Sequence, residues 1–251
     1  MSHFFYAYAG NKRNEFKLFY DELYLNTEIK NIVEPFCGSS AMSFNLWLDY
    51  GDAFDYYLND IDPLLISIYS LFMNESIEEI VKKVNKIKDT ITNKEDFTTF
   101  YKKKEKTIYE YIISQKYYNM RPGLYNSKMH NKPYSLTKKQ LLFIEFIKND
   151  KVHITNHDWE KVFNNHNNEK SLILFDPPYL DSCNEFYSDK RTVNVYEHFY
   201  TNKIVDQPSK ICFILEKIWI IDLLLGVPTA SYDKVYQLTK KKTTHGLYKN
   251  Y

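Results

Sequence analysis

A carboxylate, two prolines and an aromatic ring follow one another at residues 176–179, where the sequence reads Asp-Pro-Pro-Tyr. Asp176 supplies the carboxylate and Tyr179 the flat ring, while Pro177 and Pro178 fix the backbone and carry no N–H group. A carbonyl of this stretch can therefore face a ligand without competition from a neighbouring donor. The same four residues could instead form a rigid turn with a surface tyrosine, and their context must decide.

These groups suit the activation of an exocyclic amine on a purine. Such a nitrogen is a poor nucleophile because its lone pair is delocalised into the ring. A carboxylate and a carbonyl that accept its two N–H hydrogens would pull the nitrogen toward tetrahedral geometry and expose the lone pair. An aromatic face would hold the base by stacking. The pattern therefore predicts a site that presents a flipped-out adenine to an electrophile.

The carboxylate must be positioned by a strand, and the residues before it predict one. Residues 172–175 form a short, unbroken apolar run, which is typical of a strand buried on both faces in a parallel sheet. Asp176 then stands at the C-terminal end of this strand, where open α/β sheets place their ligand sites. The later stretches 211–215 and 232–238 are also predicted strands, and the fold class is α/β.

A second predicted strand begins at Asn31 and is followed by a loop of small residues and an apolar-periodic helix that starts near Ser39 or Ser40. Backbone N–H groups at such a helix start can point at a ligand. The loop does not read G-x-G-x-x-G, so a pyrophosphate cradle is not supported. Glu34 lies close to the turn and could attract a cation such as an α-amino group. A plain strand–loop–helix connection is the alternative.

An acidic residue follows the next predicted strand, residues 56–58. Asp60 lies 22 residues after Gly38, which is where doubly wound folds hydrogen-bond a ribose. Asp62 and Pro63 are better explained as the cap and first residue of a helix over residues 64–72.

Two further stretches could contact the same ligand. Asp158 and Trp159 follow a predicted strand at 151–155 and could hold an adenine ring by one hydrogen bond and one stack, or Asp158 could simply cap a helix. Lys12, near the N-terminus, stands either in a ligand-contacting loop or at the start of a surface helix. The polar run from residue 180 to residue 202 is predicted to be a flexible loop over the site.

The charge is unevenly distributed although the net charge is only +1. Residues 82–151 hold 17 Lys and Arg against 7 Asp and Glu, and the remainder holds 16 against 25. A helical, lysine-rich pattern from 75 to 150 predicts an inserted lobe that could face a polyanion, or else a solvated helical face. Its one irregular stretch, residues 117–134, mixes aromatics, amides and cations that could stack on bases and reach phosphates, unless it is an ordinary loop.

Several classes of protein are disfavoured by the composition. Three widely spaced cysteines without a C-x-x-C pair indicate a reducing compartment and no zinc site, and the seven histidines show no metal-binding spacing. Residues 211–227 are too interrupted by charges to span a membrane, and no signal peptide is visible. We therefore expect a cytoplasmic protein without a metal. The 30 lysines against 3 arginines fit an A/T-rich genome, bacterial or viral.

The order of these motifs resembles the Dam-like, or D12-class, DNA adenine-N6 methyltransferases, and the resemblance covers nearly the whole chain. It is carried by residues 9–12 (Ala-Gly-Asn-Lys), 34–39 (Glu-Pro-Phe-Cys-Gly-Ser), 59–62 (Asn-Asp-Ile-Asp), 158–159 (Asp-Trp) and 176–179. The resemblance implies a Rossmann-like, S-adenosylmethionine-dependent methyltransferase fold. The catalytic domain would comprise residues 1–75 and 151–251, with an inserted target-recognition domain at 76–150.

The resemblance also implies a role for each matching residue. Asp176, Pro177, Pro178 and Tyr179 would hold the target adenine. The S-adenosylmethionine site would be formed by Tyr8, Gly10, Lys12, Glu34, Pro35, Phe36, Gly38, Ser39, Asp60, Ile61, Asp158, Trp159 and Asp176. Contacts to DNA would come from Tyr118, Arg121, Tyr125, Asn126, Lys128, Asn131, Lys132 and Tyr134. The expected reaction methylates a flipped-out adenine in duplex DNA and leaves S-adenosylhomocysteine, as in restriction–modification systems, by a monomer or weak dimer.

Two departures from the family pattern affect these expectations. Ser40 replaces the second glycine of the usual loop, and we expect it to be tolerated because serine is common at helix starts. The recognition hairpin is shortened and lacks its arginine and last glycine, so the target sequence, the usual GATC or another, stays open. Two alternative functions stay open: methylation of RNA or another amine, and non-catalytic nucleic-acid binding.

Overall fold

A computed structural model of the chain describes residues 3–6, 12–118, 131–179, 193–235 and 242–251. The chain divides into two compact units. The helical unit comprises Met1–Asn11 and Asp62–Asp150, and the sheet unit comprises Lys12–Ile61 and Lys151–Tyr251. The assignment of residues 76–150 to target recognition and of the rest to catalysis stays a prediction. The helical unit begins earlier than residue 76, because α3 (Pro63–Asn74) belongs to it.

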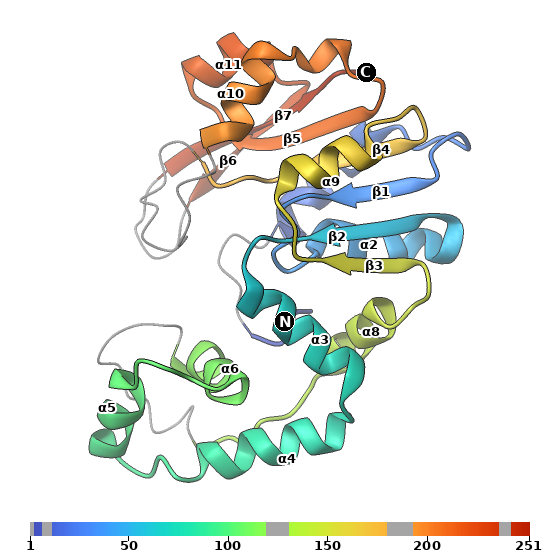
Figure 1. Cartoon of the computed structure of the whole chain (residues 1–251). Helices are drawn as coiled ribbons and strands as arrows, with labels where there is room; N and C mark the ends of the chain where they lie inside the picture. Colours follow the sequence, from blue (N-terminus) through green and yellow to red (C-terminus); the bar gives the residue numbers. More distant parts are fainter. Residues whose placement is uncertain (1–2, 7–11, 119–130, 180–192, 236–241) are drawn as a thin grey trace. The chain divides into compact units, whose positions relative to one another are not determined.

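The described part of the sheet unit contains one seven-stranded sheet (Figure 1). Its strands are β1 (Asn31–Glu34), β2 (Asp55–Asn59), β3 (Val152–Thr155), β4 (Ser171–Phe175), β5 (Lys210–Glu216), β6 (Ala230–Val235) and β7 (Lys242–Lys249). Their order is β3-β2-β1-β4-β5-β7-β6, with β1 to β5 parallel and β7 antiparallel to both of its neighbours. The order reverses between β1 and β4, which is where open α/β sheets bind ligands.

Helices cover both faces of this sheet. Trp159, Tyr196 and Ile221 come from α9 (Trp159–His166), α10 (Val193–Thr201) and α11 (Trp219–Leu225), and they share one apolar core with alternate residues of the strands. On the other face, α2 (Ala41–Tyr50) packs against β1 and has α1 (Arg13–Phe19) beside it. All five residues of β4 are buried, which confirms the predicted strand with two buried faces.

The strand register brings distant polar residues to one edge of the sheet. Because β1 to β5 are parallel, Glu34, Asn59 and Asp176 all lie at the C-terminal ends of neighbouring strands. At the end of β5, Glu216 pairs with His245 of the antiparallel strand β7. The candidate site is therefore assembled at this edge.

The helical unit contains α3, α4 (Ile77–Lys88), α5 (Lys94–Lys102), α6 (Ile108–Tyr118) and α8 (Lys138–Ile147) among its described residues. Asp62 accepts a hydrogen bond from the Leu64 N–H at 2.9 Å, so its predicted role as the cap of α3 is confirmed. Aromatic rings fill the interior of this unit, where Phe5 stacks on Phe72 with 3.6 Å between ring centroids. Short 3-10 helices occur in the sheet unit at Tyr20–Leu23, Gly51–Ala53 and Ile204–Asp206.

One element was predicted wrongly. The polar run that we expected to be a flexible loop up to residue 202 contains α10, in which Val195, Tyr196 and Phe199 are buried. Their spacing places them on one face of a helix, so a short apolar stripe forms the helix although most of the run is polar.

Candidate active site

The Asp176 carboxylate is held by a lysine at the end of β4. Lys12 Nζ lies 2.7 Å from Asp176 Oδ2, and the two side chains are only 5% and 16% exposed. The same ammonium lies 5.2 Å from the centroid of the Tyr179 ring. Burial raises the pKa of Asp176, and the charge of Lys12 opposes this shift. Lys12 was predicted to line the cofactor site, and in the structure it contacts the carboxylate and ring of the predicted adenine clamp.

The backbone after Asp176 is held in place from two sides. The Tyr196 hydroxyl, on α10, donates a hydrogen bond to the Pro178 carbonyl at 3.2 Å. The Tyr179 hydroxyl lies 3.4 Å from His245 Nδ1, and the two rings meet edge to face at 5.2 Å. The Pro178 carbonyl thus has a partner in the protein, which leaves the Pro177 carbonyl as the better candidate for a contact with a ligand.

A buried charged cluster lies behind Lys12. Glu15 of α1 forms an ion pair through Oε1 with Lys234 of β6, and its Oε2 lies 3.9 Å from Lys12 Nζ. His245 Nδ1 is 3.7 Å from the same oxygen, and burial lowers the pKa of His245 to about 4, so the imidazole is neutral at pH 7. Sequence reasoning missed Glu15 and Lys234, because only the pairing of β6 and β7 brings them to this edge.

The glycine turn after β1 is hydrogen-bonded to Asp60, the residue predicted to contact a ribose. The Gly38 N–H donates to Asp60 Oδ2 at 3.0 Å, so this carboxylate lies directly on the turn. Gly38 and Ser40 both have a φ of 49°, in the left-handed region that suits glycine. Our reason for tolerating Ser40 was therefore wrong, because its side chain makes no cap hydrogen bond at the start of α2.

Glu34 is buried between the turn and the helix that follows it. Its Oε1 accepts a hydrogen bond from the Ser43 N–H of α2 at 2.7 Å. Burial raises the pKa of Glu34 to about 8, and the nearby negative charge of Asp176 adds to the shift. The helix dipole of α2 favours the ionised form of a carboxylate at this position. A cation bound beside Glu34 would favour the same form, so it could ionise this carboxyl group.

Asn59 connects the loops around the site and was not predicted to do so. Its amide nitrogen donates to the Pro35 and His157 carbonyls at 3.0 and 2.9 Å, and its oxygen accepts from the Thr155 hydroxyl and the His157 N–H, both at 2.8 Å. The turns after β1 and β3 are therefore fixed to the end of β2. A buried amide with all four partners is costly to replace.

The remaining predicted cofactor residues are in mixed environments. Asp158 caps α9 by accepting from the Glu160 N–H at 3.0 Å, as in the alternative interpretation of this residue. Trp159 is buried in the core, where it contacts the ring of half-buried Phe36 at 6.2 Å between centroids. Pro35 and Ser39 are buried, Ile61 is exposed, and Tyr8 and Gly10 lie outside the described residues.

Only part of the predicted DNA contact set is described. Asn131 and Lys132 are exposed, whereas Tyr134 is buried, and its backbone N–H and carbonyl are hydrogen-bonded to the Asn85 side chain. Tyr134 therefore supports the lobe instead of meeting DNA, and we drop it from the proposed contacts. Tyr118 ends α6 but its side chain is not described. Arg121, Tyr125, Asn126 and Lys128 lie outside the described residues.

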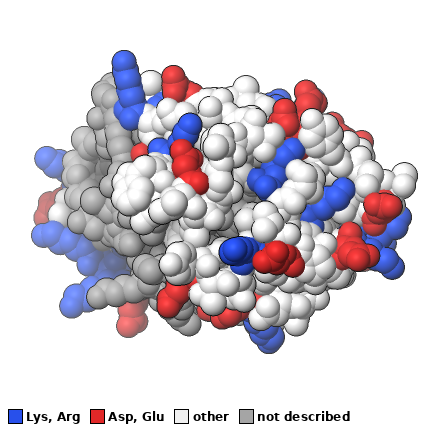
Figure 2. All heavy atoms as spheres, turned by 90° about the horizontal axis from the view of Figure 1, so that it is seen from above, with Lys and Arg blue, Asp and Glu red and all other residues white. Residues whose placement is uncertain are grey.

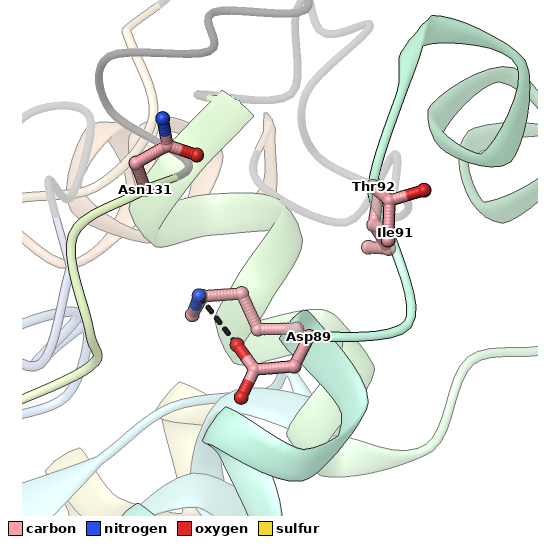
Figure 3. Close-up of a pocket in the computed structure, with 5 residues that line it drawn as sticks. Asp89, Ile91, Thr92 and Asn131 are labelled. Atoms are coloured by element: carbon pink, nitrogen blue, oxygen red, sulfur yellow. Dashed lines mark ion pairs between the residues drawn. The ribbon is translucent and has the colours of Figure 1, made fainter.

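A hollow of about 380 Å³ lies in the helical unit (Figure 3). It is lined by Lys88, Asp89, Ile91, Thr92 and Asn131. Lys88, the one cation among these lining residues, forms an ion pair with Asp89 at 2.8 Å. Its charge is thereby neutralised, and we assign no ligand to the hollow.

Figure 2 shows acidic and basic side chains interspersed over one face, with broad uncharged areas between them. No group of three or more potential metal ligands occurs within the described ranges. None of the helices in the part of the chain that is described is long and apolar enough to cross a membrane.

The sheet order, with its single antiparallel strand β7, together with the acidic residues at the strand ends, defines the Rossmann-like fold of S-adenosylmethionine-dependent methyltransferases. The profile of the D12 class N6 adenine-specific DNA methyltransferases matches residues 8–207, and the chain belongs to this family. The family resemblance and the fold class predicted from the sequence are confirmed.

Comparisons of structure and sequence give weaker likenesses. An rRNA methylase from Streptococcus thermophilus aligns over 97% of this chain and 99% of its own, with 9% identity and a TM-score of 0.42. SMU.472, solved in complex with SAH, aligns over 98% of this chain and 55% of its own, with 12% identity and a TM-score of 0.42. No curated protein matches the sequence.

Proposed function

We propose that this methyltransferase transfers a methyl group from S-adenosylmethionine to the N6 amine of a flipped-out adenine in duplex DNA. The observation that carries the proposal is the Asp176 carboxylate, held by Lys12 at the end of β4 and only partly exposed, with Tyr179 beside it. This acceptor and this ring are the groups that activation and stacking of a purine amine require. Membership of the D12 class supports adenine in DNA as the substrate.

The residues at the strand ends fit S-adenosylmethionine by their chemistry. The buried Glu34 carboxylate suits an α-amino group, because a cation there would offset the cost of ionising it. The Asp60 carboxylate on the glycine turn suits ribose hydroxyls. Phe36 and Trp159 supply an apolar wall for an adenine ring, while the turn is held in shape by Asn59. When bound, the cofactor supplies an electrophilic methyl group on a sulfonium centre.

The chain's own part in the reaction is to position and polarise the amine. In the proposed complex the Asp176 carboxylate and the Pro177 carbonyl accept the two N–H hydrogens. The nitrogen lone pair is then available to form the new N–C bond. The nitrogen becomes positively charged as that bond forms, and Asp176 stabilises this charge. Since burial raises the pKa of Asp176, this carboxylate is also a suitable acceptor for the proton that the nitrogen must lose.

The helical unit is the proposed DNA-binding part. Residues 82–151, which lie in this unit except for Lys151, hold 17 Lys and Arg against 7 Asp and Glu, and this is the excess positive charge that phosphate contacts need. Asn131 and Lys132 are exposed and of types that contact base edges and phosphates. Together with the predicted contacts at 118–128, they make residues 76–150 our candidate for target recognition.

Asp176→Asn tests the catalytic assignment directly. The change keeps the shape of the side chain but removes the charge that stabilises the nitrogen, so we expect methyl transfer to DNA to fall by about 100-fold or more. Calorimetric binding of S-adenosylhomocysteine should stay within about threefold of the wild type, and circular dichroism checks folding. A folded Asp176→Asn protein that methylates DNA at the wild-type rate would contradict the mechanism.

A further inference from the structure

The Lys12 ammonium takes the place that the proposed mechanism gives to the target amine. It is 2.7 Å from Asp176 Oδ2 and 5.2 Å from the centre of the Tyr179 ring. These are the carboxylate that would polarise the amine and the ring that would stack on the base. A carboxylate oxygen can accept more than one hydrogen bond, but the ammonium also lies over the Tyr179 ring, where the base would stack, so the lysine must move when the base enters.

A second carboxylate lies within reach of the displaced lysine. Glu15 is one helical turn away, and its Oε2 is 3.9 Å from Lys12 Nζ. This oxygen is buried and accepts no hydrogen bond within the described ranges, while the Tyr232 hydroxyl of β6 interacts with the same carboxylate. A shift of about 1 Å would bring the ammonium to hydrogen-bonding distance. The lysine would therefore exchange one buried partner for another, and an unpaired buried charge would be avoided.

The surroundings of Glu15 keep it in position for this exchange. Its other oxygen forms the ion pair with Lys234, which leaves Oε2 directed to Lys12 and His245. Neutral His245 adds no charge that would compete with the lysine. Lys234 of β6 thus holds Glu15 in place, and the other oxygen of Glu15 faces Lys12, the lysine that is paired with Asp176.

We propose that Glu15 is a positioning residue that receives the Lys12 ammonium when the target amine docks on Asp176. The inference rests on the proposed function, because it needs an amine that competes for Asp176. It has a chemical consequence. A cation held on Asp176 weakens the field of this carboxylate, whereas its transfer to Glu15 restores that field as the attacking nitrogen becomes positive. In the free protein the lysine keeps the buried carboxylate paired.

Epistasis between Glu15 and Lys12 tests this role. We would measure single-turnover methylation and S-adenosylhomocysteine affinity for the wild type, Glu15→Gln, Lys12→Met and the double variant. Glu15→Gln should slow methylation about tenfold or more and leave the affinity within about twofold. In the Lys12→Met background the same change should have less than a twofold effect, because there is no lysine left to receive. The matched control is Glu22→Gln, which removes another Glu–Lys pair, 3.6 Å to Lys249, at the opposite edge of the sheet.

Equal losses from Glu15→Gln in both backgrounds would overturn the inference, since they would reveal a merely structural role, and so would no loss in either. A second measurement needs no variant. A crystal structure of the wild type with S-adenosylhomocysteine and methylatable DNA should place Lys12 Nζ within about 3.2 Å of Glu15 Oε2. Lys12 still bound to Asp176 beside a docked adenine would refute the exchange. If the wild type methylates no nucleic acid, the proposed function fails and the inference fails with it; normal wild-type methylation without epistasis removes the inference alone.

Discussion

Two carboxylates set the electrostatics of the site: Glu34, which is buried, and Asp176, whose side chain is 16% exposed. Burial raises the pKa of both, and the charge of Asp176 raises that of Glu34 further. Within the described residues, Asp176 forms an ion pair with Lys12, whereas Glu34 forms none with a lysine. At pH 7 the free protein therefore keeps Glu34 protonated and Asp176 paired, a state that a positively charged ligand group near Glu34 would change.

The protonation of Glu34 predicts a specific dependence of stability on pH. The pKa of Glu34 is about 8 in the folded chain against an ordinary value of 4.5, so between these values the unfolded chain releases a proton that the folded chain retains. The contribution of Glu34 to stability is thus fully present below about pH 4.5 and is lost as the pH rises to about 8. Glu34→Gln, whose amide oxygen can still accept from Ser43, should gain roughly 2–4 kcal/mol relative to the wild type between pH 5 and pH 8.

Urea unfolding of both proteins at several pH values measures this difference, with Glu28→Gln on an exposed glutamate as the matched control. Parallel pH profiles for Glu34→Gln and the wild type would show that Glu34 ionises normally in the folded chain.

The site residues that could be predicted from the sequence are those that directly follow one strand. Asp176 and Asp60 were predicted because each comes directly after a short strand, and the structure places both at the same edge of the sheet. Glu15 on α1 lies 219 residues before Lys234 in the chain, and the pairing of β6 with β7 sets Lys234 and His245 together beside it. No local pattern marks such a contact.

At the scale of elements, the start of α2 is the least favourable part of the site's framework. Ser40 has a φ of 49° immediately before the helix, and its side chain makes no cap hydrogen bond. A non-glycine residue in this region costs about 1–2 kcal/mol. Ser40→Gly should therefore raise the free energy of unfolding by up to about 1 kcal/mol, after the entropy that glycine adds to the unfolded chain.

Urea unfolding measures this gain, and Ser43→Gly, inside α2, is the opposing control. There the same replacement should destabilise the protein by about 1 kcal/mol, because glycine is unfavourable in a helix interior. A loss of stability in Ser40→Gly would mean that the serine hydroxyl contributes more than the left-handed backbone costs.

The strands were easier to predict than some helices. The apolar run of β4 predicted its strand locally, and the strand predicted at residues 56–58 lies within β2. The α10 helix was missed because its three buried residues are dispersed in a polar run, and the core that buries them is supplied by β4, β5 and α9. Packing, more than the helix's own sequence, decides this element.

At the scale of the whole molecule, charge separates along the chain more clearly than its sum of +1 suggests. The lysine-rich residues 82–151 lie almost entirely in the helical unit, while the acidic strand ends lie in the sheet unit. This separation of charge supports the proposal that the helical unit binds DNA.

The most direct test of the account is a methylation assay. Wild-type protein would be incubated with S-adenosylmethionine and unmethylated duplex DNA, with structured RNA in a parallel reaction, and methylated adenines would be mapped on single DNA molecules. We expect N6-methyladenine in one short, fixed sequence context of the DNA, and at least about 100-fold slower methylation with Asp176→Asn. Methylation of the RNA alone, or no methylation of DNA by a protein that binds the cofactor, would contradict it.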